Sequence, residues 1–186
     1  DINIINDDIL KFSEKSITSD KLIVFGNLPY NISSQILVKF IINKNKFKFK
    51  KLIFMFQKEL ADRILAKVDK SNYGRFSILA NWKFNIEKII DISPNSFLPK
   101  PKVSSSLLIF NPKNSYIKFR NAENLEYVTR VFFNQRRKKI KKPINFLFKN
   151  KLDILKKLSL DLNLRPQNIS PEVFYELTRE YENLRC

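Results

Sequence analysis

Residues 22–30 read LIVFGNLPY, a short apolar run that ends in glycine, asparagine and proline. Apolar residues followed at once by turn-forming residues are typical of a buried β-strand, here over residues 22–25. In open α/β sheets, ligands bind beyond the carboxyl ends of the strands. We therefore expect the residues that follow this strand, Asn27 and Tyr30 among them, to face a binding site.

Strands and helices alternate on both sides of this run. The pattern predicts further strands at residues 2–5, 52–56, 86–92 and 103–110, and helices at residues 33–42, 58–67 and 73–82. Ser33 is the expected N-cap of the first helix. This order favours an α/β fold with a mainly parallel sheet.

The pattern becomes helical after residues 111–114, NPKN. We interpret residues 1–112 as an α/β domain and residues 113–186 as a small all-helical domain, whose last helix follows Ser170. The chain has only two glycines, Gly26 and Gly74, so no glycine-rich cofactor loop can form within it. Residues 1–112 therefore look like the second half of a doubly wound domain, lacking roughly three strand–helix units of about 30 residues.

Composition excludes several kinds of chemistry. The chain has no histidine and a single cysteine, Cys186, so it cannot form an internal disulfide, a zinc finger or a Ser-His or Cys-His catalytic pair. We expect no metal site. The apolar runs are short and the first residues are acidic, so we expect neither a membrane span nor a signal peptide, and a reducing, cytoplasmic compartment.

The charge of the chain points to a polyanionic partner. Lys and Arg number 35 against 18 Asp and Glu, a net charge of +17. Drift toward residues with A+T-rich codons is the alternative explanation for the total. The distribution is more specific, because nine basic residues and no acid lie between residues 130 and 151. This cluster, which includes Arg136, Arg137, Lys138 and Lys139, favours a nucleic-acid site over a merely solvated face.

Asn27, Leu28, Pro29 and Tyr30 suit alkylation of an exocyclic amine on a heteroaromatic ring. Such an amine is a poor nucleophile that needs polarising rather than deprotonating. The Asn27 side-chain oxygen and the Leu28 carbonyl can accept both of its N–H bonds, and Pro29 stiffens the backbone. Tyr30 can stack on the ring. An ordinary turn at the end of a strand is the alternative for this tetrapeptide alone.

Five blocks of sequence extend the argument beyond this loop: residues 27–33 (NLPYNIS), 57–63 (QKELADR), 73–77 (YGRFS), 97–105 (FLPKPKVSS) and 133–138 (FNQRRK). In this order they resemble the ribosomal RNA adenine dimethyltransferases, whose fold is a Rossmann-like methyltransferase domain followed by a helical RNA-binding domain. The large-subunit methyltransferases of macrolide resistance share the first and fourth blocks but resemble the others less well. The resemblance therefore favours the small-subunit enzymes.

The resemblance implies an enzyme that uses S-adenosylmethionine to dimethylate N6 of two adjacent adenosines in the terminal hairpin of 16S rRNA. Its partner would be small-subunit rRNA in a 30S assembly intermediate, and the full-length enzyme would be a monomer. By this resemblance, Asn27 and the Leu28 carbonyl hold the target amine, while Tyr30 and Phe97 sandwich the base.

The same resemblance assigns binding residues elsewhere in the chain. Asp8 corresponds to an acidic residue that accepts a hydrogen bond from the cofactor's adenine, and Asn27 also borders the cofactor. The RNA backbone would be clamped by cations of two segments, namely Lys100 and Lys102, and Arg136, Arg137, Lys138 and Lys139.

This sequence departs from the family in its missing glycine-rich loop and in the missing acidic residue after the second strand. The 186 residues are then either a fragment of a longer enzyme, which we favour, or a natural truncation that cannot methylate alone. Three functions stay open: the methyltransferase, a non-catalytic rRNA-binding ribosome-assembly module, and a related large-subunit rRNA or DNA adenine methyltransferase.

Overall fold

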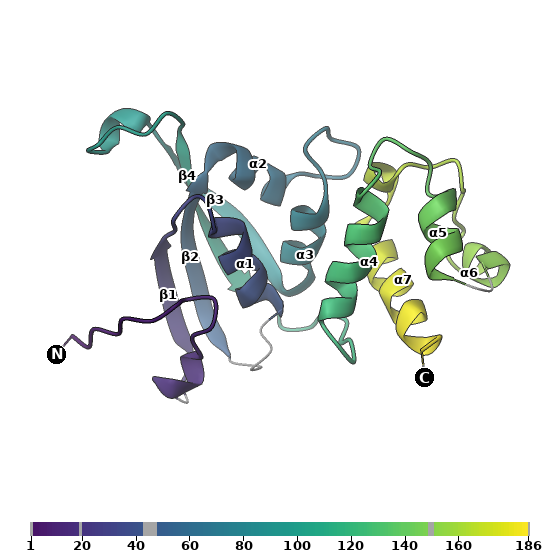
Figure 1. Ribbon diagram of the computed structural model, residues 1–186, viewed down its shortest axis with the longest axis horizontal. Coiled ribbons are helices and arrows are strands. Elements are labelled where there is room, and N and C mark those ends of the chain that lie inside the picture. Colours follow the sequence, from purple (N-terminus) through teal and green to yellow (C-terminus); the bar gives the residue numbers. More distant parts are fainter. Residues whose placement is uncertain (1, 19, 43–47, 149–150, 186) are drawn as a thin grey trace.

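The structure is a computed structural model that describes residues 2–18, 20–42, 48–148 and 151–185, without the side chains of residues 151 and 152. Cys186 lies outside the described residues. Figure 1 shows a sheet with its helices at one end of the molecule and a group of helices at the other. The strands are β1 (Leu22–Asn27), β2 (Phe49–Gln57), β3 (Phe84–Ile92) and β4 (Ser105–Pro112). The helices are α1 (Ser33–Ile42), α2 (Lys58–Leu65), α3 (Arg75–Lys83), α4 (Glu123–Phe133), α5 (Lys141–Leu147), α6 (Lys151–Lys157) and α7 (Pro171–Asn183), with short 3-10 turns at Glu14–Ser16, Pro94–Ser96 and Pro166–Asn168.

The four strands of the described chain form one mixed sheet in the order β1-β2-β4-β3. β1 and β2 are parallel, whereas β4 runs antiparallel to both β2 and β3. The prediction of a mainly parallel sheet is wrong for this reason. β4 follows β3 after residues 93–104, which contain only a 3-10 turn. A connection without a crossover helix suits an antiparallel pair. A parallel pair would require the chain to return to the end of the sheet at which the first strand began.

Two further expectations about strands fail near the beginning of the chain. Residues 2–5 form no strand, and Ile2 and Ile4 are each 92% exposed. β1 pairs on only one side within the described chain, but residues 2–5 do not join its free side and so belong to no ladder. β1 itself exists as predicted but is not fully buried, since Phe25 is 73% exposed. One face of this strand packs on the core and the other faces outward.

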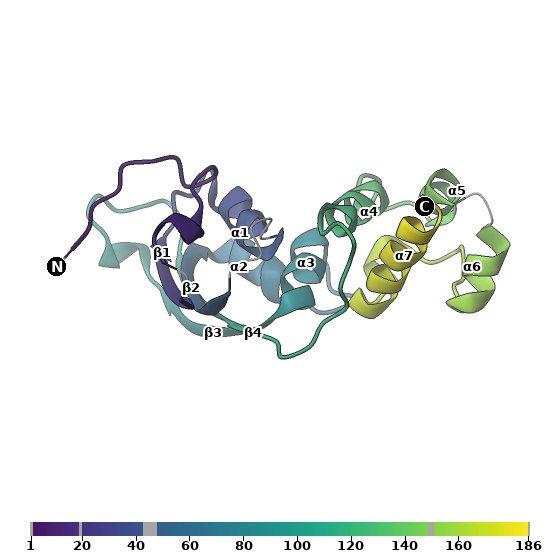
Figure 2. The ribbon, with the colours of Figure 1, turned by 90° about the horizontal axis from the view of Figure 1, so that it is seen from below.

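Helices cover one face of the sheet and join it to the helical part of the chain. Figure 2 shows α1, α2 and α3 on the same side of the strands. Beneath them, Phe54 and Phe110 on neighbouring strands are at most 1% exposed, and their ring centroids lie 6.0 Å apart. Burying aromatic side chains of this size is among the largest contributions to the stability of a small core.

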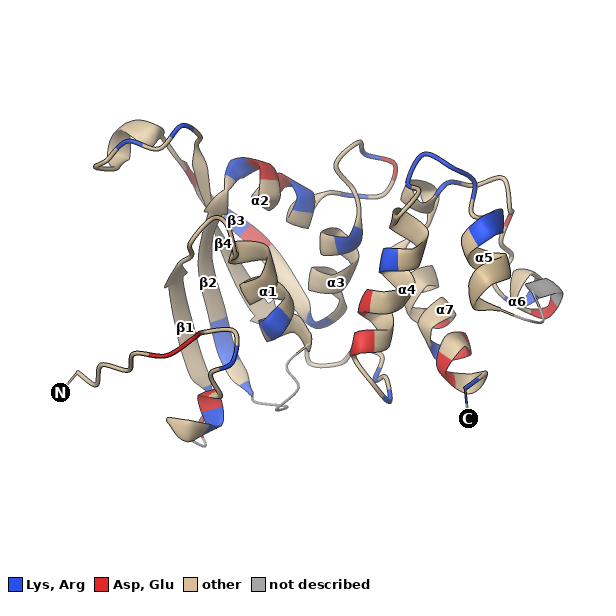
Figure 3. Cartoon of the chain, viewed as in Figure 1, with Lys and Arg blue, Asp and Glu red and all other residues tan. Residues whose placement is uncertain are grey.

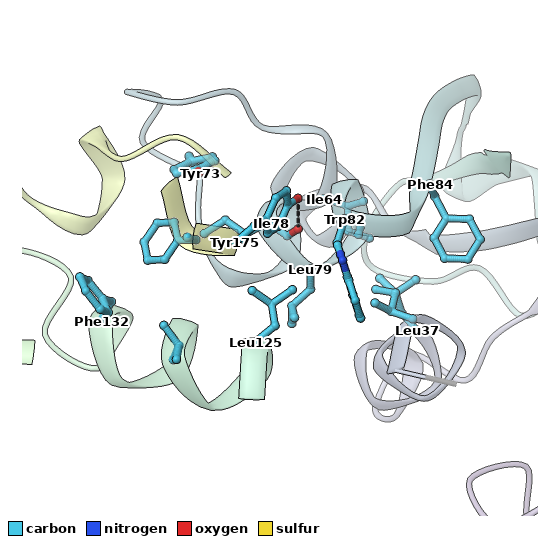
Figure 4. Close-up of a cluster of buried hydrophobic side chains, with 14 of the residues drawn as sticks. Leu37, Ile64, Tyr73, Ile78, Leu79, Trp82, Phe84, Leu125, Phe132 and Tyr175 are labelled. Atoms are coloured by element: carbon cyan, nitrogen blue, oxygen red, sulfur yellow. Dashed lines mark hydrogen bonds between the residues drawn. The ribbon is translucent and has the colours of Figure 1, made fainter. Parts of the chain in front are cut away.

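The hydrophobic core runs without a break from the sheet through α3 into α4 and α7 (Figure 4). Polar tips of buried aromatic residues bond across this junction: the Tyr175 hydroxyl donates to the Ile78 carbonyl at 2.9 Å, and the Trp82 indole N–H donates to the Ile117 carbonyl at 2.7 Å. Burial raises the pKa of Tyr175, so its hydroxyl keeps its proton and stays a donor. Residues 113–122 contain no helix or strand, but the division at residue 112 into two domains stays a prediction.

Candidate active site

β1 brings the Asn-Leu-Pro-Tyr segment to one end of the sheet, where β1 and β2 finish; we call this end the site edge. Asn27 is the last residue of β1, lies opposite Met55 of β2 and has an exposed side chain. Leu28 is only 8% exposed and belongs to the core. The buried leucine therefore anchors the turn while the asparagine carboxamide faces solvent.

Tyr30 is fixed from two directions. Its hydroxyl shares a hydrogen bond of 2.7 Å with the Ser105 hydroxyl, and Ser105 is fully buried at the start of β4. Its backbone carbonyl accepts a hydrogen bond from the Ser33 hydroxyl at 3.1 Å, at the first residue of α1. The loop after β1 is thus tied both to the helix that follows it and to a strand far along the chain.

The connection that carries Phe97 lies at this same edge. In the sheet, Gln57 pairs with Ser105, and Ser105 pairs with Ile92. The carboxyl ends of β2 and β3 and the beginning of β4 therefore coincide with the carboxyl end of β1. In Figure 1 the segment between β3 and β4 projects beyond the sheet at this end. Phe97 is partly exposed at the end of the 3-10 turn in this connection.

A cluster of charged side chains connects the elements that meet at this end of the sheet. Asp91 of β3 accepts from Lys58, the first residue of α2, at 2.8 Å, from Lys88 at 3.0 Å and from the Ser106 hydroxyl at 2.6 Å. The bond from Lys58 and those from Ser106 and Lys88 hold the pKa of Asp91 well below its usual range. Asp91 is consequently a carboxylate at neutral pH, and it ties α2 to β3 and β4.

Asp8 forms a local turn. One carboxylate oxygen accepts the backbone N–H of Leu10 at 2.9 Å, and the Asp8 carbonyl accepts the N–H groups of Lys11 and Phe12, both at 2.9 Å. The side chain is exposed. This is the turn-capping arrangement expected of an aspartate considered alone, and its role toward a cofactor stays a prediction.

The basic residues singled out from the sequence differ in their surroundings. Lys100, Lys102, Arg137 and Lys138 are exposed. Lys139 is also exposed and donates to the Asn163 side-chain oxygen at 2.7 Å. Figure 3 shows basic residues along the upper side of the view, from α2 to the turn between α4 and α5.

Arg136 is turned inward. It is partly buried, and its Nη2 donates to the backbone carbonyls of Lys70 and Ser71. This arginine therefore holds the connection between α2 and α3, a structural contact that its place in a basic run does not predict.

Ser105 and Asp91 are parts of this site that the sequence did not single out. Ser105 is the last residue of the block at residues 97–105, which was the one available signal, but nothing local pairs it with Tyr30. Within the described residues, no group of three or more potential ligands is placed to hold a metal ion. None of the helices in the described part of the chain has the length and apolarity needed to cross a membrane.

Comparison with known proteins identifies the family of the chain. The family model for ribosomal RNA adenine dimethylase matches residues 1–183. The chain is 56% identical to ribosomal RNA small subunit methyltransferase A of Pelagibacter ubique, covering 100% of this chain and 71% of that relative. It is 39% identical to the protein of the same name from Borreliella burgdorferi, covering 92% of this chain but only 59% of that one.

Two solved structures share the fold. A dimethyladenosine transferase from Plasmodium falciparum superposes with a TM-score of 0.74 at 28% identity, covering 87% of this chain and 66% of that one. The 23S rRNA methyltransferase ErmE superposes with a TM-score of 0.63 at 17% identity, covering 96% of this chain and 71% of that one, a likeness of fold alone. The chain belongs to the ribosomal RNA adenine dimethylase family.

Proposed function

We propose that this chain supplies the target-base site and the RNA-binding helices of an enzyme that dimethylates N6 of two adjacent adenosines in the 3′-terminal hairpin of small-subunit rRNA. The observation that carries the proposal is the placement of Asn27 at an exposed sheet edge, beside a Tyr30 ring held by Ser105. Because the substrate is an assembling ribosomal subunit, we place the reaction in the cytoplasm.

The residues at the edge have complementary tasks. The Asn27 side-chain oxygen and the Leu28 carbonyl each accept a hydrogen bond from one N–H group of the adenine amine. These two hydrogen bonds draw the nitrogen lone pair out of conjugation with the ring. Tyr30 and Phe97 stack on the two faces of the flipped base. Pro29 leaves no N–H that would compete for the carbonyl oxygens. This arrangement needs no histidine as a general base.

The family depends on S-adenosylmethionine, and the described residues fit this cofactor in part. Asp8 has an exposed carboxylate that can accept from the cofactor's adenine amine, and Asn27 is exposed at the sheet edge. Both glycines have other tasks, since Gly26 lies within β1 and Gly74 precedes α3. The bound cofactor supplies an electrophilic methyl group on sulfur, and Asn27 orients the amine toward it.

A chimera tests the proposal. The chain is fused to the part of the Pelagibacter relative that it does not cover, and incubated with S-adenosylmethionine labelled on its methyl group and with unmethylated small subunits. We expect label on the adjacent adenosines of the hairpin. Asn27→Ala should lower kcat by about 100-fold or more, the usual effect of removing one polarising group. Asn114→Ala, an exposed asparagine after the far end of β4, is the matched control.

The alternatives give different results. A non-catalytic assembly module would bind rRNA in a salt-sensitive way that Asn27→Ala does not change, with no transfer from a folded, cofactor-bound chimera. Transfer to duplex DNA or to large-subunit rRNA in preference to the hairpin would indicate the related adenine methyltransferases. Either result would refute the proposed function.

A further inference from the structure

A small pocket lined by arginines lies between α2, α3 and the turn after α4. Its volume is about 170 Å³, and the residues used below are Arg63, Gly74, Arg75, Phe76, Phe133 and Arg136. No Asp or Glu side chain is among the residues that line it. We call it the arginine pocket.

Arg63 and Arg75 both line this pocket, and of the two only Arg75 is paired with a carboxylate in the described chain. Arg63 is exposed on α2, and its guanidinium lies 5.2 Å from the centroid of the Phe76 ring. Among the described residues no carboxylate forms an ion pair with Arg63. Arg75 pairs with Glu126 through Nη2 at 3.2 Å, and its side chain keeps 32% exposure.

Two N–H donors at the pocket lack a partner. The Nε atoms of Arg75 and Arg136 are both buried without a hydrogen bond. Leaving such donors unpaired is unfavourable, because they have lost water and gained nothing in exchange. A modest turn of either guanidinium toward an oxyanion in the pocket would satisfy them.

The local electrostatics favour an anion. Burial lowers the pKa of Arg75, and the positive charges of Arg130 and Arg63 act in the same direction against the opposing effect of Glu126. The pocket also lies at the amino end of α3, where Arg75 is the first residue and the helix dipole favours negative charge. The exposed Arg137 and Lys138 follow Arg136 directly, so the turn after α4 is basic (Figure 3).

We propose that the arginine pocket binds one phosphate group of the RNA backbone. The inference rests on the proposed function, because it names a contact of the same RNA. Guanidinium groups match phosphate oxygens with paired N–H bonds, and an arginine that stacks on an aromatic ring, as Arg63 does on Phe76, is held ready for this contact. The adjoining run of cations favours a phosphate within a polymer over a free ion.

Salt-dependent RNA binding tests the proposal without requiring catalysis. The affinity of the chain for the 3′-terminal hairpin of small-subunit rRNA is measured over a range of salt for wild type, Arg63→Gln, Arg75→Lys, Arg75→Gln and the double variant Arg63→Gln/Arg75→Gln. Arg179→Gln, an exposed arginine of α7 paired with Glu176, is the control. Urea unfolding of each variant separates loss of binding from loss of fold.

A shared phosphate makes a distinctive prediction. Arg63→Gln and Arg75→Gln should each weaken binding about tenfold and reduce the slope of log affinity against log salt by about 0.7 to 0.9, the value for one phosphate. The double variant should lose no more slope than either single variant. Arg75→Lys keeps the charge and should keep the slope, yet it should bind several-fold more weakly because it lacks the forked donor set.

Other results overturn the inference. A double variant whose salt slope falls by the sum of the two single changes would show diffuse surface charge instead. So would an Arg75→Lys variant that binds the hairpin as tightly as wild type. Binding of inorganic phosphate that is lost in the double variant, with unchanged RNA affinity, would assign the pocket to a free anion. Salt-dependent hairpin binding that weakens as predicted, in a chimera that transfers no methyl group, would refute the proposed function and leave this site standing.

Discussion

Gly26, the residue before Asn27, has no room for a side chain. A Cβ atom placed on it would lie 2.6 Å from Leu28 Cδ2 and 2.9 Å from Phe54 Cδ1, both closer than carbon atoms approach. The end of the Leu28 side chain can rotate, but Phe54 is held by three other rings, with centroid distances of 5.3 Å to Phe40, 6.1 Å to Phe56 and 6.0 Å to Phe110. Gly26→Ala must therefore displace either the core or the turn that carries Asn27.

The size of the effect follows from two opposing contributions. Overpacking a tight core costs about 1–3 kcal/mol, while replacing glycine by alanine reduces the entropy of the unfolded chain and returns about 0.4–1 kcal/mol. We expect a net destabilisation of about 1–2 kcal/mol. With a urea dependence of about 2 kcal/mol per molar, the unfolding midpoint should fall by about 0.5–1 M.

Gly74→Ala is the matched control for this experiment. A Cβ at Gly74 meets Phe133 at 3.8 Å, an ordinary contact, and the backbone there is extended. The small cost of alanine as an N-cap and the entropic gain nearly cancel, so its midpoint should stay close to wild type. A Gly26→Ala variant that unfolds at the same urea concentration as Gly74→Ala would refute the steric argument.

Three further substitutions test buried polar groups by urea unfolding. Burial lowers the pKa of Lys83 to about 8 from its ordinary 10.5, so between these pH values the unfolded chain holds a proton at Lys83 that the folded chain has lost. The contribution of Lys83 to stability should therefore rise with pH by up to about 3 kcal/mol. Relative to wild type, Lys83→Met should lack this rise, and parallel pH profiles of the two proteins would contradict it. Glu182 accepts two backbone N–H bonds at 3.0 Å just before α4, so Glu182→Gln, with one acceptor oxygen, should lose about 1–3 kcal/mol, and an unchanged midpoint would count against this network. Tyr73→Phe removes a buried 2.9 Å hydrogen bond to the Ile169 carbonyl and should cost about 1–2 kcal/mol, whereas a stabilised variant would show that this bond contributes nothing net.

Elements set by neighbouring residues were predictable from the sequence. The helix expected at residues 33–42 has these bounds in the structure, because apolar residues repeat at helical spacing within it. The expected N-cap is wrong: Ser33 is the first residue of the helix, and its hydroxyl donates to the Tyr30 carbonyl instead of accepting a helix N–H. β2, β3 and β4 also occur where apolar runs lie, with ends shifted by at most three residues. Local pattern favours an element where its periodicity matches one buried face.

Features set by distant residues were not predictable in this way. Residues 2–5 have a strand-like composition, but a strand requires a partner, and no local signal reports whether one exists. The inward turn of Arg136 has the same cause, because the carbonyls it contacts belong to residues more than sixty positions earlier. The bond from Tyr30 to Ser105 likewise spans 75 positions. The motif alone identified the chemical groups of the candidate site, while the fold determines what holds them.

The direction of β4 links the fold to the proposed chemistry. Had β4 been parallel to its neighbours, as most strands are in a mainly parallel sheet, its first residue would lie at the opposite end of the strands, far from the loop after β1. The antiparallel pairing instead places Ser105 beside Gln57 and Ile92, at the edge where β1 ends. Ser105 can therefore bond to Tyr30, and the connection bearing Phe97 begins and ends beside that tyrosine. A site that grips a base between Tyr30 and Phe97 requires this reversal, so the failed prediction about strand direction concerns the feature on which the proposed base-binding site most depends.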